Sequence, residues 1–267
     1  MQNLTKIKKL LIASKTDPSG FSIYEHLKST YPWKSIDDVL IHGNIALHLQ
    51  DEPLLFRDFP ESEFENRFIV ENIIFLSRHS SARDISSITV HPMGNFSTAD
   101  LGGAVGKFSI TSPELMSNSL RIIKENYHGS KFLVTLEATH HGPISNIPSF
   151  FAEIGTTPED WSDKAALEAL SHAVMESNAN DYPNYIGVGG GHYSPKITSY
   201  ILENKVNIGH IISKHRHNEL TMKILVDAAM KTPKLRGFII DKKGSKATAL
   251  NLVKELSKNK GYENIIL

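Results

Sequence analysis

Four short stretches contain histidine, a residue type that holds metals and moves protons. In each stretch histidine is combined with glycine, serine or acidic residues. They are SRHS at 77–80, HPMGN at 91–95, EATHHGP at 137–143 and GVGGGHYSP at 187–195. Each follows an apolar, β-rich run, so each is expected where a strand ends in a loop. Open α/β sheets place their chemistry in the crevice beyond the carboxyl ends of their strands. The four stretches therefore predict one site assembled from several strand ends.

The pair His140-His141, close to Glu137, is the sharpest local feature. The chain has no cysteine, so any metal must be held by His, Asp or Glu, which suits zinc or another divalent ion that binds imidazole. Adjacent strand residues point to opposite faces, so both histidines reach one metal only if the chain bends, and Gly142-Pro143 supplies a bend. Glu137 would then be a ligand or a general base. Two histidines bonded to backbone at a strand end would explain the same residues.

The glycine run at 189–191, followed by His192 and Tyr193, suits close approach of a ligand to the backbone. Glycines after a strand cost conformational entropy and usually serve positive φ or such an approach. Their N–H groups could hold an anion or an oxyanion. The run matches neither a GxGxxG dinucleotide motif nor a P-loop, because the required spacing and GK[ST] are absent. A tight strand-to-helix turn would need the same glycines.

Charge is balanced overall but uneven along the chain. The 29 basic side chains match 29 acidic ones. Between residues 205 and 260, however, there are 13 Lys and Arg and only four acids, a difference of +9. This basic third includes Lys214 and Arg216 in the run KHRH. It could meet a phosphate backbone, or it could form solvated helix faces.

The chain shows no sign of a membrane segment. No stretch approaches the roughly 20 apolar residues that a membrane helix needs. Residues 1–11 contain only a short apolar patch, too short for the core of a signal peptide. The absence of cysteine also excludes disulfides. We therefore expect a cytoplasmic protein by default, with no membrane contact.

The order of predicted elements indicates an α/β fold with a mixed, mostly parallel sheet, in one domain spanning 1–267. A hairpin with its turn near Gly43-Asn44 is expected at 39–50, and 52–66 should be loop. Apolar runs predict strands at 9–13, 68–76, 88–90, 131–137, 185–188, 206–212 and 235–240. Helical spacing predicts helices at 23–29, 113–126, 157–177, 196–203, 219–230 and 246–258.

The four stretches, in this order, resemble the archaeal and plant type of D-aminoacyl-tRNA deacylase. The motifs that carry the resemblance are SRHSS, HPMGNF with the following DLGG, EATHHGP and GVGGGHYSPKIT. The resemblance extends from the first strand to the basic run near His215. It implies a three-layer α/β/α fold of the phosphorylase/hydrolase-like kind. It also implies hydrolysis of the ester between a D-amino acid and tRNA, with zinc as cofactor. Lys196 stands where the family leads us to expect arginine, and this weakens bidentate binding of phosphate.

On this basis we hypothesise a zinc-assisted centre surrounded by His79, His140, His141 and His192. Glu137, His141 and His192 would carry the catalysis, with Glu137 as base or ligand. Discrimination against L-substrates would arise from steric exclusion at a glycine-rich wall. The residues expected to contact the tRNA substrate are His91, Asn95, Gly102, Gly103, Gly189, Gly190, Gly191, Tyr193, Lys196, Lys214 and Arg216. The glycine amides would hold the oxyanion or the terminal phosphate, and the three basic residues would touch the acceptor stem.

Two other functions fit part of the pattern. A zinc-dependent amidase or peptidase on a similar fold would use the same residue types, although no HExxH helix is present. A module that binds tRNA ends or nucleosides without turnover is the third possibility. Cleavage assays on D-aminoacyl-tRNA and on peptides separate the three, and no obligatory protein partner is expected for any of them.

Overall fold

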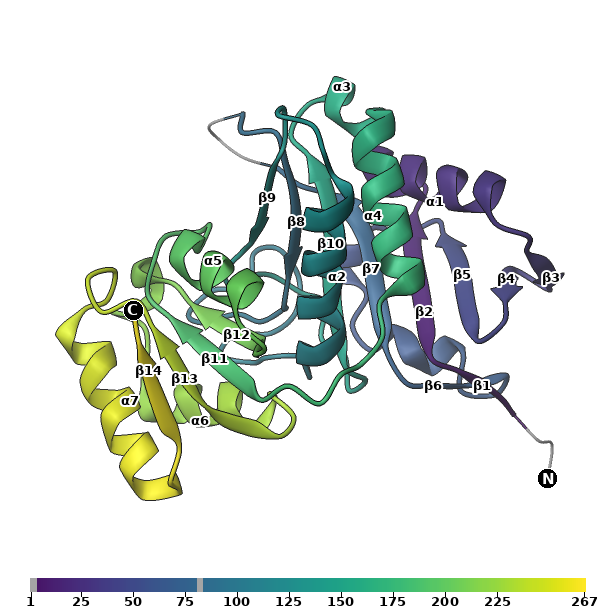
Figure 1. Cartoon of the computed structure of the whole chain (residues 1–267). Coiled ribbons are helices and arrows are strands. Elements are labelled where there is room, and N and C mark those ends of the chain that lie inside the picture. Colours follow the sequence, from purple (N-terminus) through teal and green to yellow (C-terminus); the bar gives the residue numbers. More distant parts are fainter. Residues whose placement is uncertain (1–3, 81–83) are drawn as a thin grey trace.

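The computed structural model describes residues 4–80 and 84–267, which alternate between strands and helices (Figure 1). The strands are β1 (Thr5–Ile7), β2 (Lys9–Ser14), β3 (Lys34–Ile36), β4 (Val39–His42), β5 (Ile45–Gln50), β6 (Phe68–Val70), β7 (Ile73–Arg78), β8 (Ser87–His91), β9 (Leu133–Leu136), β10 (Ser149–Gly155), β11 (Asn184–Val188), β12 (Asn207–Ile212), β13 (Leu235–Ile240) and β14 (Glu263–Ile266). The helices are α1 (Pro18–Thr30), α2 (Pro113–Asn126), α3 (Pro158–Trp161), α4 (Lys164–Glu176), α5 (Pro195–Glu203), α6 (Met222–Met230) and α7 (Ala247–Lys260), with 3₁₀ turns η1 (Leu54–Phe56), η2 (Pro60–Glu63) and η3 (Lys214–Arg216).

The larger sheet has eight strands in the order β3-β4-β5-β2-β7-β10-β8-β9. Its centre, from β5 through β2 and β7 to β10, is parallel. Strands β8 and β9 are parallel to each other, but β8 is antiparallel to β10. The two directions within one sheet decide how the site is assembled.

The smaller sheet has the order β12-β11-β13-β14 and is entirely parallel. Helices α6 and α7 cover one face through a cluster that includes Val188, Leu225, Phe238 and Val253. Helix α2 packs against β12 and β11 from the other side. This sheet therefore has helices on both faces, because its strands are apolar runs buried on both sides.

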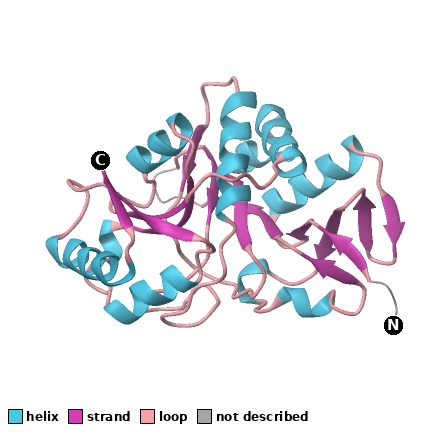
Figure 2. Ribbon diagram, turned by 60° about the horizontal axis from the view of Figure 1, so that its bottom comes forward, coloured by secondary structure: helices cyan, strands magenta, loops and turns pink. Residues whose placement is uncertain are grey.

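The two faces of the larger sheet are covered differently. Helices α1, α2 and α4 pack on one face, in a core that also contains Ile208 and Ile239 of the smaller sheet. The other face buries Phe75 and Phe151 under the 3₁₀ turns and loops, with Leu54 among the covering residues. In Figure 2, long helices lie on one side of the larger sheet and short helical turns on the other, whereas the smaller sheet has helices on both sides.

The predicted α/β class with mostly parallel strands is confirmed. The hairpin at 39–50 is present as β4 and β5, and the helix at 113–126 matches α2. The prediction of one strand at 68–76 is wrong, because this segment forms two strands, β6 and β7. The helix predicted at 157–177 is also two, because the chain breaks after α3 and Asp163 caps the start of α4. Strand β10 was not predicted.

Across the residues that the structure describes, no helix combines the length and apolarity needed to cross a bilayer.

Candidate active site

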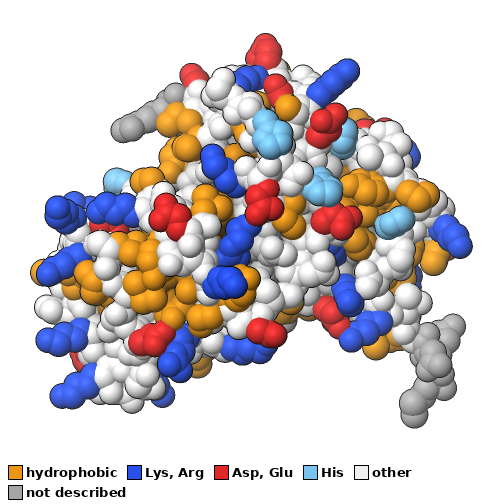
Figure 3. Space-filling view, in the orientation of Figure 1, with side chains coloured by type: hydrophobic (Ala, Val, Ile, Leu, Met, Phe, Trp, Pro, Cys, Tyr) orange, Lys and Arg blue, Asp and Glu red, His pale blue; other side chains and the backbone are white. Residues whose placement is uncertain are grey.

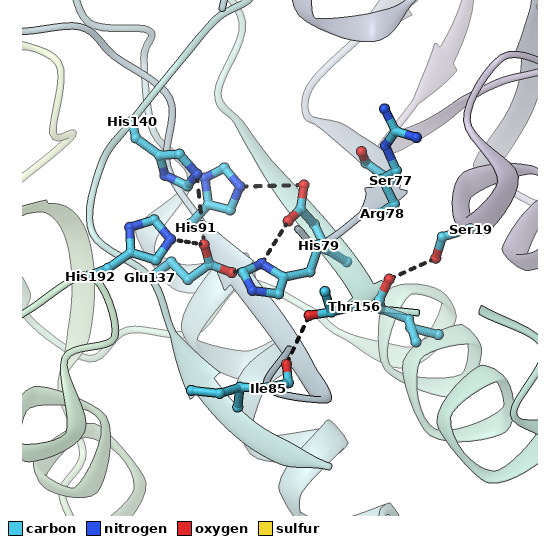
Figure 4. Close-up of polar contacts among 12 residues, drawn as sticks. Ser19, Ser77, Arg78, His79, Ile85, His91, Glu137, His140, Thr156 and His192 are labelled. Atoms are coloured by element: carbon cyan, nitrogen blue, oxygen red, sulfur yellow. Dashed lines mark hydrogen bonds and ion pairs between the residues drawn. The ribbon is translucent and has the colours of Figure 1, made fainter. Parts of the chain in front are cut away.

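The histidine-bearing segments meet on the loop-covered face of the larger sheet (Figure 4). His79 follows the end of β7, and His91 is the last residue of β8. Since β8 runs antiparallel to β10 and β7 runs parallel to it, these histidines approach Glu153 of β10 from opposite directions. The ring of His91 stacks on Phe151, with centroids 5.2 Å apart, which places it on the same face as Glu153. The segments come together at strand ends, as predicted, but because β8 is antiparallel to β10 they meet on a face of the sheet and not in a crevice beyond the carboxyl ends of parallel strands.

Three histidines form the centre of the site. The ring centroids of His91 and His140 are 4.2 Å apart, as are those of His140 and His141. One ring nitrogen from each of the three lies within 4.8 Å of the others. Each Nδ1 contacts a backbone carbonyl, which can only accept, so Nδ1 carries a proton in all three rings and Nε2 is the atom left to face a metal. Burial lowers the pKa of His91, but Glu153 outweighs it and raises that pKa, so a metal would replace a proton at Nε2 of His91. Histidines anchored in this way are typical metal ligands.

Burial and the neighbouring His91 keep the rings of His140 and His141 neutral. Together they lower the pKa of His140 well below its usual value and that of His141 to about 4. Metal binding requires the neutral ring, because the proton and the metal compete for the same lone pair. His140 and His141 are therefore prepared to bind a metal near neutral pH.

A local bend in the chain lets the adjacent side chains of His140 and His141 point to the same place. His141 has φ of 41°, in the left-handed region, so the chain turns between the two rings. Gly142 follows, and a Cβ there would lie 2.4 Å from the backbone nitrogen of Gly103 and 2.8 Å from the carbonyl oxygen of Leu55. The bend thus depends on close backbone packing that only glycine permits.

Two buried carboxylates lie beside the histidines. Glu137, with no exposed surface, places its oxygens 2.9 Å from His79 Nδ1 and 2.7 Å from His192 Nε2. Glu153 lies 3.6 Å from both His79 and His91. Burial alone would raise the pKa of Glu137, but His192 and His79 outweigh it and hold that pKa well below its usual value. Glu137 is therefore a carboxylate anion.

His79 is held between these carboxylates as a cation. Burial would lower its pKa, but Glu137 and Glu153 raise it to about 11. Its Nε2 lies 2.6 Å from the hydroxyl of Tyr193. Both ring nitrogens of His79 are thus occupied by protein groups.

Several polar atoms in this cluster have no aligned hydrogen-bond partner. They are Nε2 of His91 and both carboxylate oxygens of Glu137, all fully buried. Unpaired buried polar atoms are costly, and a bound ion is one of the groups that can satisfy them. Glu137, His140 and His192 also bring one ligand atom each within 4.8 Å of one another. The donors are imidazole nitrogen and carboxylate oxygen atoms, which fits a divalent cation such as zinc.

The glycine stretches mostly serve backbone packing. The N–H of Gly189 donates to Ile212 O and that of Gly190 to Gly244 O, so two of the three amides expected to hold an anion are already engaged. Both glycines have positive φ.

The second glycine stretch packs in a similar way. Asn95 donates to the carbonyl oxygen of Gly102 at 2.8 Å. A Cβ on Gly102 would lie 1.6 Å from Leu55 O, and one on Gly103 would lie 2.8 Å from Asn95 Nδ2. These contacts hold the loop against η1.

The predicted phosphate contacts lie around the smaller sheet. Lys196 pairs with Asp241 at 2.7 Å, and Arg216 pairs with Glu219 at 3.1 Å. Lys214 is exposed. Figure 3 shows lysines and arginines concentrated over the region of α7 and β14, on the side of the molecule that carries the smaller sheet.

A cavity of about 420 Å³ opens beside the histidines. One side is apolar, with Leu54, Leu55 and Leu101, and another is polar, with Asp17 and Arg78. His140, His141, His192 and Glu153 also line it. The size is that of an ordinary small-molecule site. The structure therefore joins a metal-suited cluster to a space for substrate.

Sequence reasoning missed Glu153 and Asp17. Glu153 is the only acid in the run SFFAEIG, which follows Pro148 and is now seen to be β10. An isolated acid inside such an apolar run was the signal available. His91 was expected only to contact substrate, whereas the structure places it among the candidate metal ligands.

Comparison with known proteins identifies the family. The family model for D-aminoacyl-tRNA deacylase matches residues 67–265. A D-aminoacyl-tRNA deacylase of Thermoplasma volcanium is 42% identical over 260 residues, covering 97% of this chain and 100% of the relative. One of Archaeoglobus fulgidus is 32% identical, covering 96% of this chain and 95% of the relative. The crystal structure of AF0625, described as a conserved protein of unknown function, superposes with a TM-score of 0.90 at 31% identity, covering 97% of this chain and 95% of that one. The chain belongs to the D-aminoacyl-tRNA deacylase family.

Proposed function

We propose that this chain hydrolyses the ester of D-aminoacyl-tRNA, releasing the D-amino acid and free tRNA, at the cluster of His91, His140 and His141. The observation that carries the proposal is the convergence of three histidines, each anchored through Nδ1, beside the anionic Glu137 and an open cavity. The family's name states the same reaction.

We propose zinc as the cofactor, held by Nε2 of His91, His140 and His141. The buried Nε2 of His91, which has no hydrogen-bond partner, supports this choice, because a cation there removes the cost of burying it. When bound, zinc supplies Lewis-acid activation of water and of the ester carbonyl.

His192 is the residue best placed to move a proton. Its side chain is 45% exposed and lines the cavity, while Nε2 lies 2.7 Å from Glu137. Glu137 orients the ring and stabilises its cation, as carboxylates do for catalytic histidines. His192 then takes a proton from the attacking water and returns it to the leaving ribose oxygen.

His79 and Tyr193 act together on the substrate side. A doubly protonated His79 donates from Nε2 to the oxygen of Tyr193, so the phenolic hydrogen is directed elsewhere. We assign that O–H as a donor to the oxyanion that forms at the ester carbonyl. His79 is then a positioning residue held by Glu137 and Glu153, and this role differs from the ligand role expected from sequence.

Lys214, Lys196 and Arg216 remain our candidates for the acceptor stem of tRNA, with Lys242 and Lys243 as exposed neighbours in the loop after β13. That loop is joined to the glycine loop by the bond from Gly190 N to Gly244 O. Phosphate neutralisation by such side chains needs no sequence-specific contact. We further propose that residues 1–267 act as one domain in the cytoplasm, where tRNA is found, without an obligatory protein partner.

The test is hydrolysis of D-tyrosyl-tRNA and L-tyrosyl-tRNA by the purified chain, with a D-tyrosyl peptide as a third substrate. The proposal requires release of D-tyrosine from tRNA, with little release from the L-ester or the peptide. Cleavage of the peptide alone would point to an amidase, and saturable tRNA binding without any cleavage would point to a binding module.

A further inference from the structure

We propose that Asp17 binds the α-ammonium group of the aminoacyl ester, while the apolar wall of the cavity receives the side chain of that amino acid. The inference rests on the proposed function, because it concerns the same substrate in the same cavity. It assigns a specificity-determining role to a residue that neither the histidine cluster nor the basic surface uses.

Asp17 is fixed in place at the entrance to α1. Its Oδ1 accepts a hydrogen bond from the N–H of Gly20 at 2.8 Å. Its Oδ2 accepts from Ser77 Oγ at 2.8 Å and from the N–H of Arg78 at 3.1 Å. A carboxylate offers about four acceptor positions, so one remains for a ligand. The anchoring bonds orient the carboxylate before substrate arrives.

Among residues 4–80 and 84–267, no lysine, arginine or histidine forms an ion pair with Asp17. In Figure 4 the side chain of Arg78 points away from the histidines. Burial raises the pKa of Asp17, in the direction expected for an anion without a positive partner. An ammonium group is the chemical complement of this carboxylate.

The other walls of the cavity suit the other two groups on the α-carbon. His140, His141 and His192 line the part where the ester must react. Leu54, Leu55 and Leu101 form the apolar side, and Leu101 is 53% exposed, unusual for a large apolar residue. Three different surfaces around one carbon distinguish mirror images, because the enantiomer can match only two of them at once.

The experiment compares kcat/KM for D-tyrosyl-tRNA and N-acetyl-D-tyrosyl-tRNA, which differ in the positive charge at the α-nitrogen. We expect the wild type to prefer the free amine by about 10- to 100-fold, the range of a hydrogen bond between charged groups. Asp17→Asn should bring the ratio close to one by slowing the free-amine substrate, with the N-acetyl substrate unaffected. Asparagine caps helices as well as aspartate does.

A matched variant controls for the structural role of Asp17. Asp163→Asn alters the cap of α4 in the same way, where the carboxylate accepts from Ala166 N. It should keep the wild-type ratio. If Asp17→Asn is unstable, Asp17→Ser removes the same charge and still caps the helix.

The outcomes separate the two claims. An Asp17 variant that keeps the preference for the free amine overturns the inference, as does a wild type that cleaves both D-esters equally well. A wild type that cleaves neither ester overturns the proposed function, and the inference with it. A loss of preference that occurs equally in Asp163→Asn would reduce the effect to helix capping and also overturn the inference.

Discussion

The rings of His91 and His140 lie with their centroids 4.2 Å apart, although one ends β8 and the other follows β9 by several residues. Both rings are anchored through Nδ1 to backbone carbonyls, His91 at 3.2 Å and His140 at 2.8 Å. This shared orientation is what makes the pair a candidate metal centre.

The first prediction concerns His91. His91→Ala should lower zinc content to below about one tenth of the wild-type content and kcat/KM for D-tyrosyl-tRNA by at least about 100-fold, because the metal has one ligand fewer. Metal analysis of the purified protein and initial rates provide the measurements. His172→Ala, at an exposed position of α4, is the matched control and should leave both unchanged. Retention of full metal content by His91→Ala would contradict the ligand assignment.

The second prediction concerns Glu153. Glu153→Gln keeps the shape but removes the charge that faces His79 and His91. We expect zinc affinity to fall about 10- to 100-fold, the usual effect of removing a carboxylate next to a ligating histidine. A chelator competition assay measures it. An unchanged affinity would show that Glu153 only keeps His79 protonated and has no effect on the metal.

Glu153 also shows what the sequence could and could not predict. Apolar runs predicted the positions of β2, β11 and β13. Glycine and proline after His140-His141 predicted a bend in that loop. The direction of β8 was not predicted, because an isolated strand carries no signal of whether its neighbour is parallel. That direction brings His91 to Glu153, so the sequence alone predicted a substrate contact for His91 and not a metal ligand.

Backbone packing limited the prediction of the glycine sites for a related reason. The presence of glycine suggests a backbone position with positive φ, but it does not reveal which residues pack against that glycine in the fold. Gly189 and Gly102 proved to face Asp241 and Leu55 of distant segments. Long-range contacts of this kind depend on the fold as a whole, so these glycines were read as ligand contacts.

The third prediction tests that packing. Gly102→Ala should destabilise the chain by about 2–5 kcal/mol, because its Cβ would lie 1.6 Å from Leu55 O at a φ of 79°. Gly43→Ala is the control, with φ of 60° but open space around its Cβ, and should cost only about 1–2 kcal/mol. Denaturant unfolding measures both. Equal losses at the two positions would refute the packing argument.

The fourth prediction concerns pH. Lys9 is buried and donates through Nζ to Met175 O and to Ser177 O at the end of α4. Burial lowers its pKa to about 8, against 10.5 in the unfolded chain. Between these pH values the unfolded chain binds more protons, so the free energy of unfolding rises with pH.

Lys9→Met removes this dependence. The difference in unfolding free energy between wild type and Lys9→Met should therefore shift in favour of the wild type as pH rises from about 8 to about 10. Urea unfolding at several pH values gives the difference directly. Parallel pH profiles for the two proteins would show that Lys9 titrates as it does in the unfolded state.

The fifth prediction concerns tRNA. Replacing both Lys242 and Lys243 with alanine should raise KM for D-aminoacyl-tRNA without changing kcat. It should also reduce the slope of log affinity against log salt by about one for each lysine that neutralises a phosphate. The control is alanine at Lys28 of α1 and Lys34 of β3, two exposed positions at the far end of the larger sheet. An unchanged salt slope would place the acceptor stem elsewhere.

The most direct test of the central claim is a zinc titration of the metal-depleted protein, followed by hydrolysis of D-tyrosyl-tRNA. The account predicts negligible activity before zinc is added, a rise in proportion to the zinc bound, and no such rise in His91→Ala. Full activity in the metal-depleted protein would contradict it.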